Sequence, residues 1–337
     1  MPYCIGTDEA GYGPNLGPLV ITATLWRTPD GVDDALYKPL EHAVCAVPKK
    51  GKGVIDERLW LADSKAVYSP ADGIERLEVG VLAALGACGM RPVDLRELLR
   101  EVCGVDHESA WRLPWHGEVH VDVPLVCLRE RVEEAALQLA AGLRSAQIEL
   151  VALASRVVFP EEFNAEVKRH GNKSTLLTQE TLKLVRAMLD RCESGDVSIA
   201  CDKHGGRNAY APALDEHVTS GRLTDGFVQV VRESRADSTY RWRETATENA
   251  AAHDTVRRVE ISFRPRSETR LPAALASMTS KYVREATMRA WNEFWKRHLP
   301  EIRPTAGYPG DAARFRKEIH TTARKLKLNH TLWWRSR

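Results

Sequence analysis

The chain has 337 residues, of which 43% are hydrophobic and 28% are charged, and its formal net charge is +2. This composition is typical of a soluble globular protein, and no apolar run approaches the ~20 residues that a membrane-spanning helix needs. Seven cysteines without a C-x-x-C pair argue against a disulfide framework and a zinc site. We therefore expect a cytoplasmic protein with no secretory signal and no membrane partner.

A pair of acids followed by glycines and prolines stands near the start of the sequence. Residues 2–6 predict a short buried strand and residues 19–26 a second one, so the stretch that begins with Asp8 and Glu9 is expected at the turn of a hairpin. Adjacent carboxylates at the end of a buried strand repel each other unless a cation is close. On this stretch alone, a chemical role and a solvated acidic turn are equally good interpretations.

The rest of the chain alternates between patterns typical of helices and of strands, which favours one α/β domain. Helices are expected at residues 74–85, 129–143, 174–189 and 271–295, with a short one that begins at Pro160. Strands are expected at residues 118–123, 146–159, 196–201 and 227–231, and an added hairpin at residues 241–263. Residues 28–60 are expected to be irregular, with a flexible basic tip at 49–53, and residues 88–117 give no clear pattern.

Four acids stand at or just after the ends of expected strands. They are Asp8 and Glu9 after the first strand, Asp202 at the end of residues 196–201, and Asp237 a few residues past the following strand. Because strand ends gather at one edge of an α/β sheet, these side chains are expected to converge. An oxygen-rich pocket suits Mg²⁺ or Mn²⁺, and two such ions can cleave a phosphodiester. The competing interpretation makes Asp202 and Asp237 ordinary turn or cap residues.

Basic residues occur in two places where they can meet phosphates. The last stretch of the chain combines Trp333-Trp334 with many cations, a mixture that suits nucleic acid as well as it suits a solvated helix face with a packed aromatic end. Its cations are Arg314, Arg316, Lys317, Arg324, Lys325, Lys327, Arg335 and Arg337. After Asp202, the Gly205-Gly206 pair predicts either an anion-binding nest with Arg207 on a phosphate or a plain tight turn. His204 in this loop is either a proton shuttle or a residue without a role.

Several segments, in order along the chain, resemble the type 2 ribonucleases H. The first, Asp8-Glu9-Ala10-Gly11-Tyr12-Gly13-Pro14 followed by Gly17-Pro18, is similar to the opening signature of that family. The others are Asp63-Ser64-Lys65, the region of Arg156-Val157 and Phe163-Asn164, Asp202 after its strand, the segment from Glu233 to Tyr240, the helix from Ala276 to Glu285, and the turn Gly307-Tyr308-Pro309. Each segment alone is a weak signal, whereas their common order is specific.

The resemblance implies an RNase H-like fold, in which helices flank a mixed central sheet, with insertions near residues 28–60, 88–117 and 241–270 and a C-terminal helical region. It implies a nuclease domain at residues 1–300, on which a basic and aromatic extension, residues 301–337, packs, and a monomer is favoured. The implied activity is metal-dependent hydrolysis of the RNA strand of RNA/DNA hybrids. Two metal ions would act in it, and the products would carry a 3′-hydroxyl and a 5′-phosphate.

Matched residue by residue, the resemblance also implies roles for individual groups. The ligands of two Mg²⁺ or Mn²⁺ ions would be Asp8, Glu9, Asp202 and Asp237. The 2′-hydroxyl would be sensed by the backbone of Gly11, Tyr12 and Gly13. The phosphates would be contacted by Ser64, Lys65 and Lys281, and a sugar by Tyr308. The alternatives are surface positions for both lysines and packing of Tyr308 on its own turn.

Tyr12 is a departure, because the family usually has arginine between the two glycines. Backbone recognition would then work without a planar five-donor cation. Two other functions stay open: a nuclease of this fold with a shifted substrate, such as structured RNA or DNA, and a nucleic-acid-binding protein of this fold without activity. The presence of all four acids speaks against the second.

Overall fold

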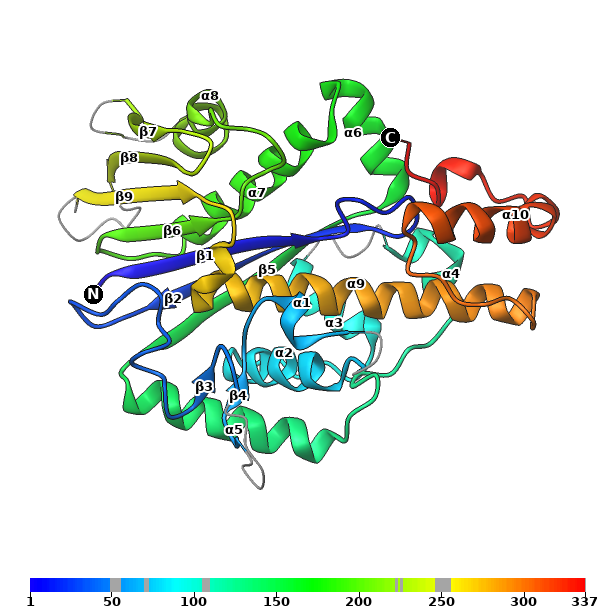
Figure 1. Cartoon of the computed structure of the whole chain (residues 1–337), viewed down its shortest axis with the longest axis horizontal. Coiled ribbons are helices and arrows are strands. Elements are labelled where there is room, and N and C mark those ends of the chain that lie inside the picture. Colours follow the sequence, from blue (N-terminus) through cyan, green and yellow to red (C-terminus); the bar gives the residue numbers. More distant parts are fainter. Residues whose placement is uncertain are drawn as a thin grey trace.

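The fold centres on a seven-stranded mixed sheet (Figure 1). The computed structural model describes residues 1–48, 56–69, 73–104, 110–221, 224, 227–245 and 256–336. In the order in which they lie across the sheet, the strands are β5 (Glu149–Val158), β2 (Leu19–Arg27), β1 (Tyr3–Ala10), β6 (Val197–Cys201), β9 (Val256–Phe263), β8 (Ser238–Thr245) and β7 (Gln229–Glu233). Two short strands, β3 (Val44–Cys45) and β4 (Leu59–Trp60), pair separately.

The three central strands share one direction. β6 runs parallel to β1 on one side and to β9 on the other. From β1 the sheet continues with the antiparallel strands β2 and β5, and from β9 it continues with the antiparallel strands β8 and β7. The carboxyl ends of β1, β6 and β9 therefore meet at one edge, where the side chains that follow these strands come together.

Helices cover both faces of the sheet (Figure 1). One face carries α6 (Pro160–His170), α7 (Lys173–Leu189), α8 (Ala211–Leu214) and the π-helical turn η2 (Asp215–Thr219). On the other face, α9 (Leu271–His298) packs on β1 and β2, and α3 (Leu95–Cys103) packs on β5. Next to α9 lie α1 (Ser64–Val67), α2 (Glu75–Ala87) and α4 (Pro114–Gly117), and α5 (Arg129–Ser145) packs on α2. The remaining elements are α10 (Pro309–Lys325) and the 3₁₀ turns η3 (Ser267–Thr269) and η4 (His330–Leu332).

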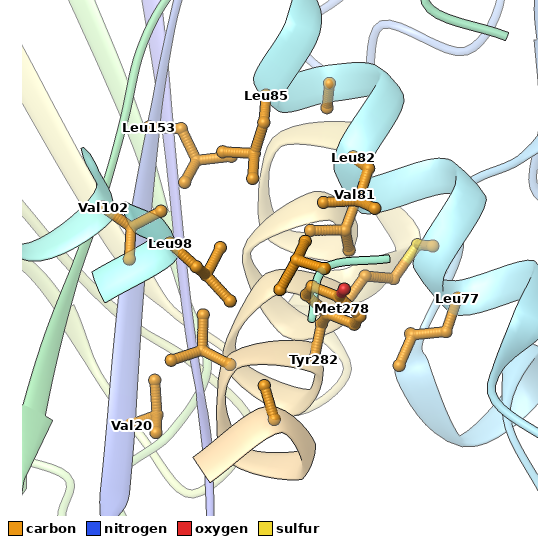
Figure 2. Packing of buried hydrophobic residues seen from close by; sticks show 14 of the residues in the cluster. Val20, Leu77, Val81, Leu82, Leu85, Leu98, Val102, Leu153, Met278 and Tyr282 are labelled. Carbon is orange, nitrogen blue, oxygen red and sulfur yellow. The ribbon is translucent and has the colours of Figure 1, made fainter. Parts of the chain in front are cut away.

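The larger core joins α9 to the helices outside it. Leu77 and Val81 of α2 and Met278 and Tyr282 of α9 belong to this core, which Figure 2 shows from close by. The inner side of α9 rests directly on the sheet: a Cβ at Gly6 of β1 would lie 2.1 Å from the carbonyl carbon of the second residue of α9, Pro272. Only glycine permits so close a backbone approach.

The expected fold class, a mixed sheet flanked by helices, is confirmed. The strand expected at residues 118–123 is wrong. Within the described chain this stretch forms the isolated bridge Asp94–Asp122 instead of a strand ladder, and Leu95 donates to the Val121 carbonyl (2.9 Å). Its alternating valines are buried. The alternation of apolar and polar residues in this stretch therefore reflects burial of an extended segment and not pairing in a sheet.

Two other segments differ from expectation. Residues 241–263 do contain a hairpin, β8–β9, but it is not an addition at the periphery, because β9 pairs with β6 inside the central sheet. Residues 88–117, which gave no clear pattern, contain α3 and α4. The expected basic tip at 49–53 lies outside the described residues. Among the described helices, none combines the length and the apolar character needed to cross a bilayer.

Candidate active site

Two aspartates lie next to each other at the carboxyl edge of the parallel strands. Thr7 of β1 is the parallel partner of Cys201 of β6, so the residues that follow them, Asp8 and Asp202, are neighbours. Asp8 is only 8% exposed. Its backbone carbonyl accepts a hydrogen bond from the Ser280 hydroxyl of α9 (3.1 Å), which ties the end of β1 to the helix.

Two glutamates join these aspartates, and we call Asp8, Glu9, Asp202 and Glu268 the carboxylate cluster. Glu268 lies in η3, the turn between β9 and α9. Burial raises the pKa of every member, and repulsion by other members adds to this effect for Asp8, Glu9 and Glu268. Glu9 and Glu268 raise the pKa of Asp8, Asp202 and Glu268 raise that of Glu9, and Asp202 raises that of Glu268. The four acids therefore form one electrostatic unit.

The carboxylate cluster contains an acid with a strongly raised pKa and a buried oxygen without a partner among the described residues. Burial, followed by the charge of Asp202, raises the pKa of Glu9 to about 7. Lys65 acts in the opposite direction on Glu9 and Asp202. Even so, Oδ1 of Asp202 is buried and has no hydrogen-bond partner among the described residues. An unpartnered carboxylate oxygen among other acids costs folding free energy unless a cation binds there.

These features fit a divalent cation. Carboxylate oxygens are the ligands that Mg²⁺ and Mn²⁺ prefer, and a bound cation would both relieve the repulsion and give the Asp202 Oδ1 a partner. In the ranges that the structure describes, no group of three or more His, Cys, Asp or Glu side chains is already arranged to hold a metal ion. The carboxylate cluster thus has the chemistry of a metal site without a preformed ligand shell.

Asp237, the fourth acid expected from the sequence, lies outside the carboxylate cluster. It immediately precedes β8, where its carboxylate pairs with Arg232 (3.1 Å) and Arg264 (3.8 Å) and accepts a hydrogen bond from the Ser234 hydroxyl (3.2 Å). Because β9 lies between β8 and β6, a whole strand separates Asp237 from Asp202. The two arginines already balance its charge.

Glu268 was missed from the sequence because residues 241–270 were interpreted as an insertion. The available signal was its position, directly between a β-branched stretch and the start of the long helix at Leu271. The parallel pairing of β9 with β6 is not visible in the sequence. Only this pairing places the turn after β9 at the same edge as Asp8 and Asp202.

α1 presents Ser64 and Lys65 beside the carboxylate cluster. Asp63 caps this helix by accepting a hydrogen bond from the Lys65 N–H (3.0 Å). The hydroxyls of Ser64 and Ser277 lie 3.1 Å apart, and Ser277 also hydrogen-bonds the Asp8 carboxylate. The Lys65 side chain is exposed at this point, with its charge facing the acids.

The loop that follows β1 offers backbone donors next to the carboxylate cluster. Gly11 has a φ of +88°, and a Cβ there would lie 2.6 Å from Arg284 Nε, so glycine is required. The N–H groups of Gly11, Tyr12 and Gly13 donate to no acceptor within the described chain. The Tyr12 ring packs against Lys173, whose Nζ lies 4.4 Å from the ring centroid. These N–H groups are free to bind a ligand.

The loop after Asp202 turns its histidine away from solvent. His204 is 2% exposed, its Nδ1 lies 3.0 Å from Thr178 Oγ1, and burial lowers its pKa to about 3. A buried imidazole that stays neutral and contacts α7 does not support the proton-shuttle interpretation. Arg207 donates to the Thr175 hydroxyl of α7 (3.1 Å) and lies close enough to Tyr12 to lower its pKa, an effect smaller than the rise caused by burial.

Lys281 and Tyr308 have different surroundings. Lys281 Nζ pairs with Glu285 (2.5 Å) and lies 4.4 Å from the centre of the Tyr68 ring. Tyr308 precedes α10 and is 52% exposed, so its ring is available to a ligand. The lysine, by contrast, already has an acidic partner.

A cavity of about 720 Å³ adjoins the carboxylate cluster. Asp202 and Glu268 line it, and so do several cations. These are Lys65, Lys203, Arg235 and Arg266. Acids and cations on one open surface suit a polyanion whose phosphates meet the cations while one of them approaches the carboxylates.

No protein-family model and no curated protein sequence matches the chain. Three similar solved structures are all ribonucleases H. Ribonuclease H2 from Pyrococcus horikoshii OT3 is 14% identical, with 98% of this chain and 92% of that chain covered and a TM-score of 0.39. RNase HII from Archaeoglobus fulgidus, solved in a complex with PCNA, is 13% identical, with 99% and 94% covered and a TM-score of 0.40. Bst-RNase HIII in complex with Mn²⁺ is 13% identical, with 88% and 55% covered and a TM-score of 0.34. Similarities of this size do not establish a family or an activity, so the function has to be inferred from the site.

Proposed function

We propose that this chain is a divalent-metal-dependent endoribonuclease of the ribonuclease H type, which hydrolyses the RNA strand of RNA/DNA hybrids to 3′-hydroxyl and 5′-phosphate ends. The observation that carries the proposal is the carboxylate cluster, in which buried acids raise one another's pKa and one buried oxygen has no described partner. Buried acids with raised pKa values beside an open cavity are typical of a functional site. The order of the motifs that resemble type 2 ribonucleases H supports the same function.

In this proposal, Asp8, Glu9, Asp202 and Glu268 hold the metal ions, and Glu268 takes the role first expected for Asp237. Bound Mg²⁺ or Mn²⁺ would polarise the scissile phosphate and lower the pKa of an attacking water. The protein contributes the placement of the acids. β1 and β6 set the distance between the two aspartates, and hydroxyls of α9 hydrogen-bond the backbone and the side chain of Asp8.

Groups around the carboxylate cluster fit the substrate. The free N–H groups of residues 11–13 can donate to a 2′-hydroxyl oxygen, which is the atom that distinguishes RNA from DNA. Lys65 and the other cations of the cavity suit phosphates, and Ser64 lies beside them. Arg207, Lys281 and Tyr308 stay predicted contacts to phosphate and sugar.

Cleavage of four labelled duplexes of one sequence tests the function: an RNA/DNA hybrid, double-stranded RNA, double-stranded DNA, and DNA with a single ribonucleotide, each with Mg²⁺ and with Mn²⁺. We expect the hybrid to be cut and the products to carry the stated ends. Asp202→Asn should remove the activity. Glu260→Gln, which takes an acid from the exposed pair with Arg241, is the charge-matched control and should keep it.

Other outcomes would assign the alternatives. Cleavage of double-stranded RNA or DNA in preference to the hybrid would indicate a nuclease of shifted substrate. Tight binding without cleavage under any metal condition would indicate a nucleic-acid-binding protein. Neither binding nor cleavage of any duplex would contradict a nucleic-acid function altogether.

A further inference from the structure

The second-last described residue of the chain is a buried arginine. Arg335 is 1% exposed, and its guanidinium lies 4.5 Å from the centre of the Phe163 ring of α6. Its Nη2 donates to the carbonyl of Gly11 (2.5 Å) and also to that of Pro14. A single side chain thus bridges two carbonyls of the loop between β1 and β2, which carries the free donors of the candidate site.

Backbone contacts fasten the C-terminal segment, residues 334–336, to the same place (Figure 1). The Arg335 N–H donates to the Asn15 carbonyl (2.8 Å), and the Asn15 amide donates back to the Arg335 carbonyl (3.2 Å). On the other side, Asn164 of α6 donates to the Trp334 carbonyl (2.8 Å) and accepts from the Ser336 N–H (2.7 Å). The segment is therefore held between the loop and α6.

A second buried arginine supports the loop from α9. Arg284 Nη2 donates to the carbonyls of Leu16 (3.1 Å) and Ala306 (2.9 Å), and its Nε packs against Gly11. Arg284 and Arg335 are both buried, and burial lowers the pKa of each guanidinium. Backbone carbonyls accept from Nη2 of each guanidinium, and the Phe163 ring faces Arg335. Nε of both arginines and Nη1 of Arg335 are buried without a described partner.

Several of these contacts engage carbonyls of the loop. The carbonyls of Gly11, Pro14, Asn15 and Leu16 point to the two arginines and the C-terminal segment. The N–H groups of residues 11–13 are left without described acceptors. Opposite ends of a peptide unit point in opposite directions, so a cation that draws the carbonyl of Gly11 inward turns the N–H of Tyr12 outward.

We propose that Arg335 is a positioning residue that keeps the backbone N–H group of Tyr12 directed at the substrate, so that the C-terminal segment determines the selection of ribose. The identity of that substrate rests on the proposed function. The loop lies more than three hundred positions from Arg335 in the sequence, and the fold of the chain brings the two together. A basic C-terminus thereby acts through backbone geometry and not as a free phosphate-binding arm.

Amide hydrogen exchange of the free protein tests the positioning without any substrate or metal. Arg335→Gln removes the cation and loosens the loop. We therefore expect faster exchange in the peptide that covers residues 9–17, where the N–H groups of Asn15 and Leu16 are protected because they donate to the Gly307 carbonyl. Arg324→Gln, which removes the same charge from the exposed side of α10, is the matched control and should leave that peptide unchanged. Unchanged exchange in Arg335→Gln would overturn the inference.

Binding measurements test the link to selection. We compare the hybrid with a DNA duplex of the same sequence, with Ca²⁺ in place of Mg²⁺ to limit cleavage. Loss of one oriented donor is worth roughly 1 kcal/mol, so the preference for the hybrid should fall by about fivefold in Arg335→Gln. Faster exchange combined with an unchanged preference would also overturn the inference, because the segment would then be a structural anchor only.

Two further variants keep the test decisive if Arg335→Gln is poorly folded. Asn164→Ala removes the two hydrogen bonds that hold the C-terminal segment to α6 without touching the loop, and it should move exchange and preference in the same direction to a smaller extent. In Arg335→Ala, added guanidinium ion at millimolar concentration should restore the preference. If the wild-type protein shows no preference for the hybrid, the proposed function fails, whereas the exchange result still decides whether Arg335 orients the loop.

Discussion

Asp202 lies one residue past the pairing of Cys201 with Thr7, which makes it the neighbour of Asp8 across two parallel strands. Burial raises the pKa of both carboxyl groups, and the charges of Glu9 and Glu268 raise that of Asp8 further. Keeping these carboxyl groups ionised in the folded protein therefore costs folding free energy. The sign of this cost can be measured as the change in the free energy of unfolding when one of the two acids is replaced.

Asp202→Asn should stabilise the metal-free protein and remove its response to metal. Without metal, the neutral amide relieves repulsion, and we expect the free energy of unfolding in EDTA to rise by about 1 kcal/mol. With Mg²⁺ at 100 times its Kd, the wild type should gain about 2.7 kcal/mol, and the variant much less. Urea unfolding in EDTA and in Mg²⁺ measures both. A variant that is less stable in EDTA, with an unchanged Mg²⁺ response, would contradict the metal site.

Substitutions of Glu268 and of Asp237 should have different effects on kcat, and they test which residue is the fourth acid of the site. Glu268→Gln should lower kcat on the hybrid by about 100-fold, because it removes a charge that acts on Asp8 and Glu9. Asp237→Asn should keep the wild-type kcat, since it weakens only the pairs with two arginines. Steady-state cleavage of the hybrid by both variants decides between the two residues. The reverse pattern would return the role to Asp237.

Because His116 is buried, we expect the free energy of unfolding to fall in mild acid. Burial lowers its pKa from 6.5 to about 4, so between these values the unfolded chain binds a proton that the folded protein does not. The free energy of unfolding should therefore fall as the pH drops through this window, by about 3 kcal/mol in total once the pH is below 4. Urea unfolding at pH 7 and at pH 5 should show a smaller difference for His116→Gln than for the wild type. The exposed residue His42 supplies the control, His42→Gln, which should keep the wild-type difference.

Two neighbouring arginines of β9 should differ widely in their effect on stability. Arg257 is 1% exposed and donates to Glu244 (2.6 Å), so Arg257→Leu leaves a buried carboxylate short of one partner and should cost about 3–5 kcal/mol. Arg258 pairs with Asp196 at the surface, and Arg258→Leu should cost at most about 1 kcal/mol. Chemical unfolding of both variants measures the difference. Equal costs would show that burial does not set the value of these ion pairs.

Local patterns in the sequence predicted many of the elements. Apolar runs located β1 and β2, which are buried on both faces, and alternating or helical periodicity located β5, β6, α2, α5, α7 and α9 to within a few residues. The acid pair at Asp8 and Glu9 was also found from the sequence, but it was expected in the turn after the first strand, whereas both residues lie within β1, which continues to Ala10. Residues 118–123 show the limit, because a buried extended segment has the same period as a strand.

The sequence by itself determined which residue types are available: an acid pair, a glycine-rich turn, further acids after apolar stretches, and a basic C-terminus. Tertiary structure alone decided which of them meet. Parallel pairing of β9 with β6 brings Glu268 to the carboxylate cluster and leaves Asp237 outside, and the docking of the last residues brings Arg335 to the loop after β1. Strand pairing and burial depend on the free energy of the whole fold, so contacts between distant positions leave no local pattern from which they can be predicted.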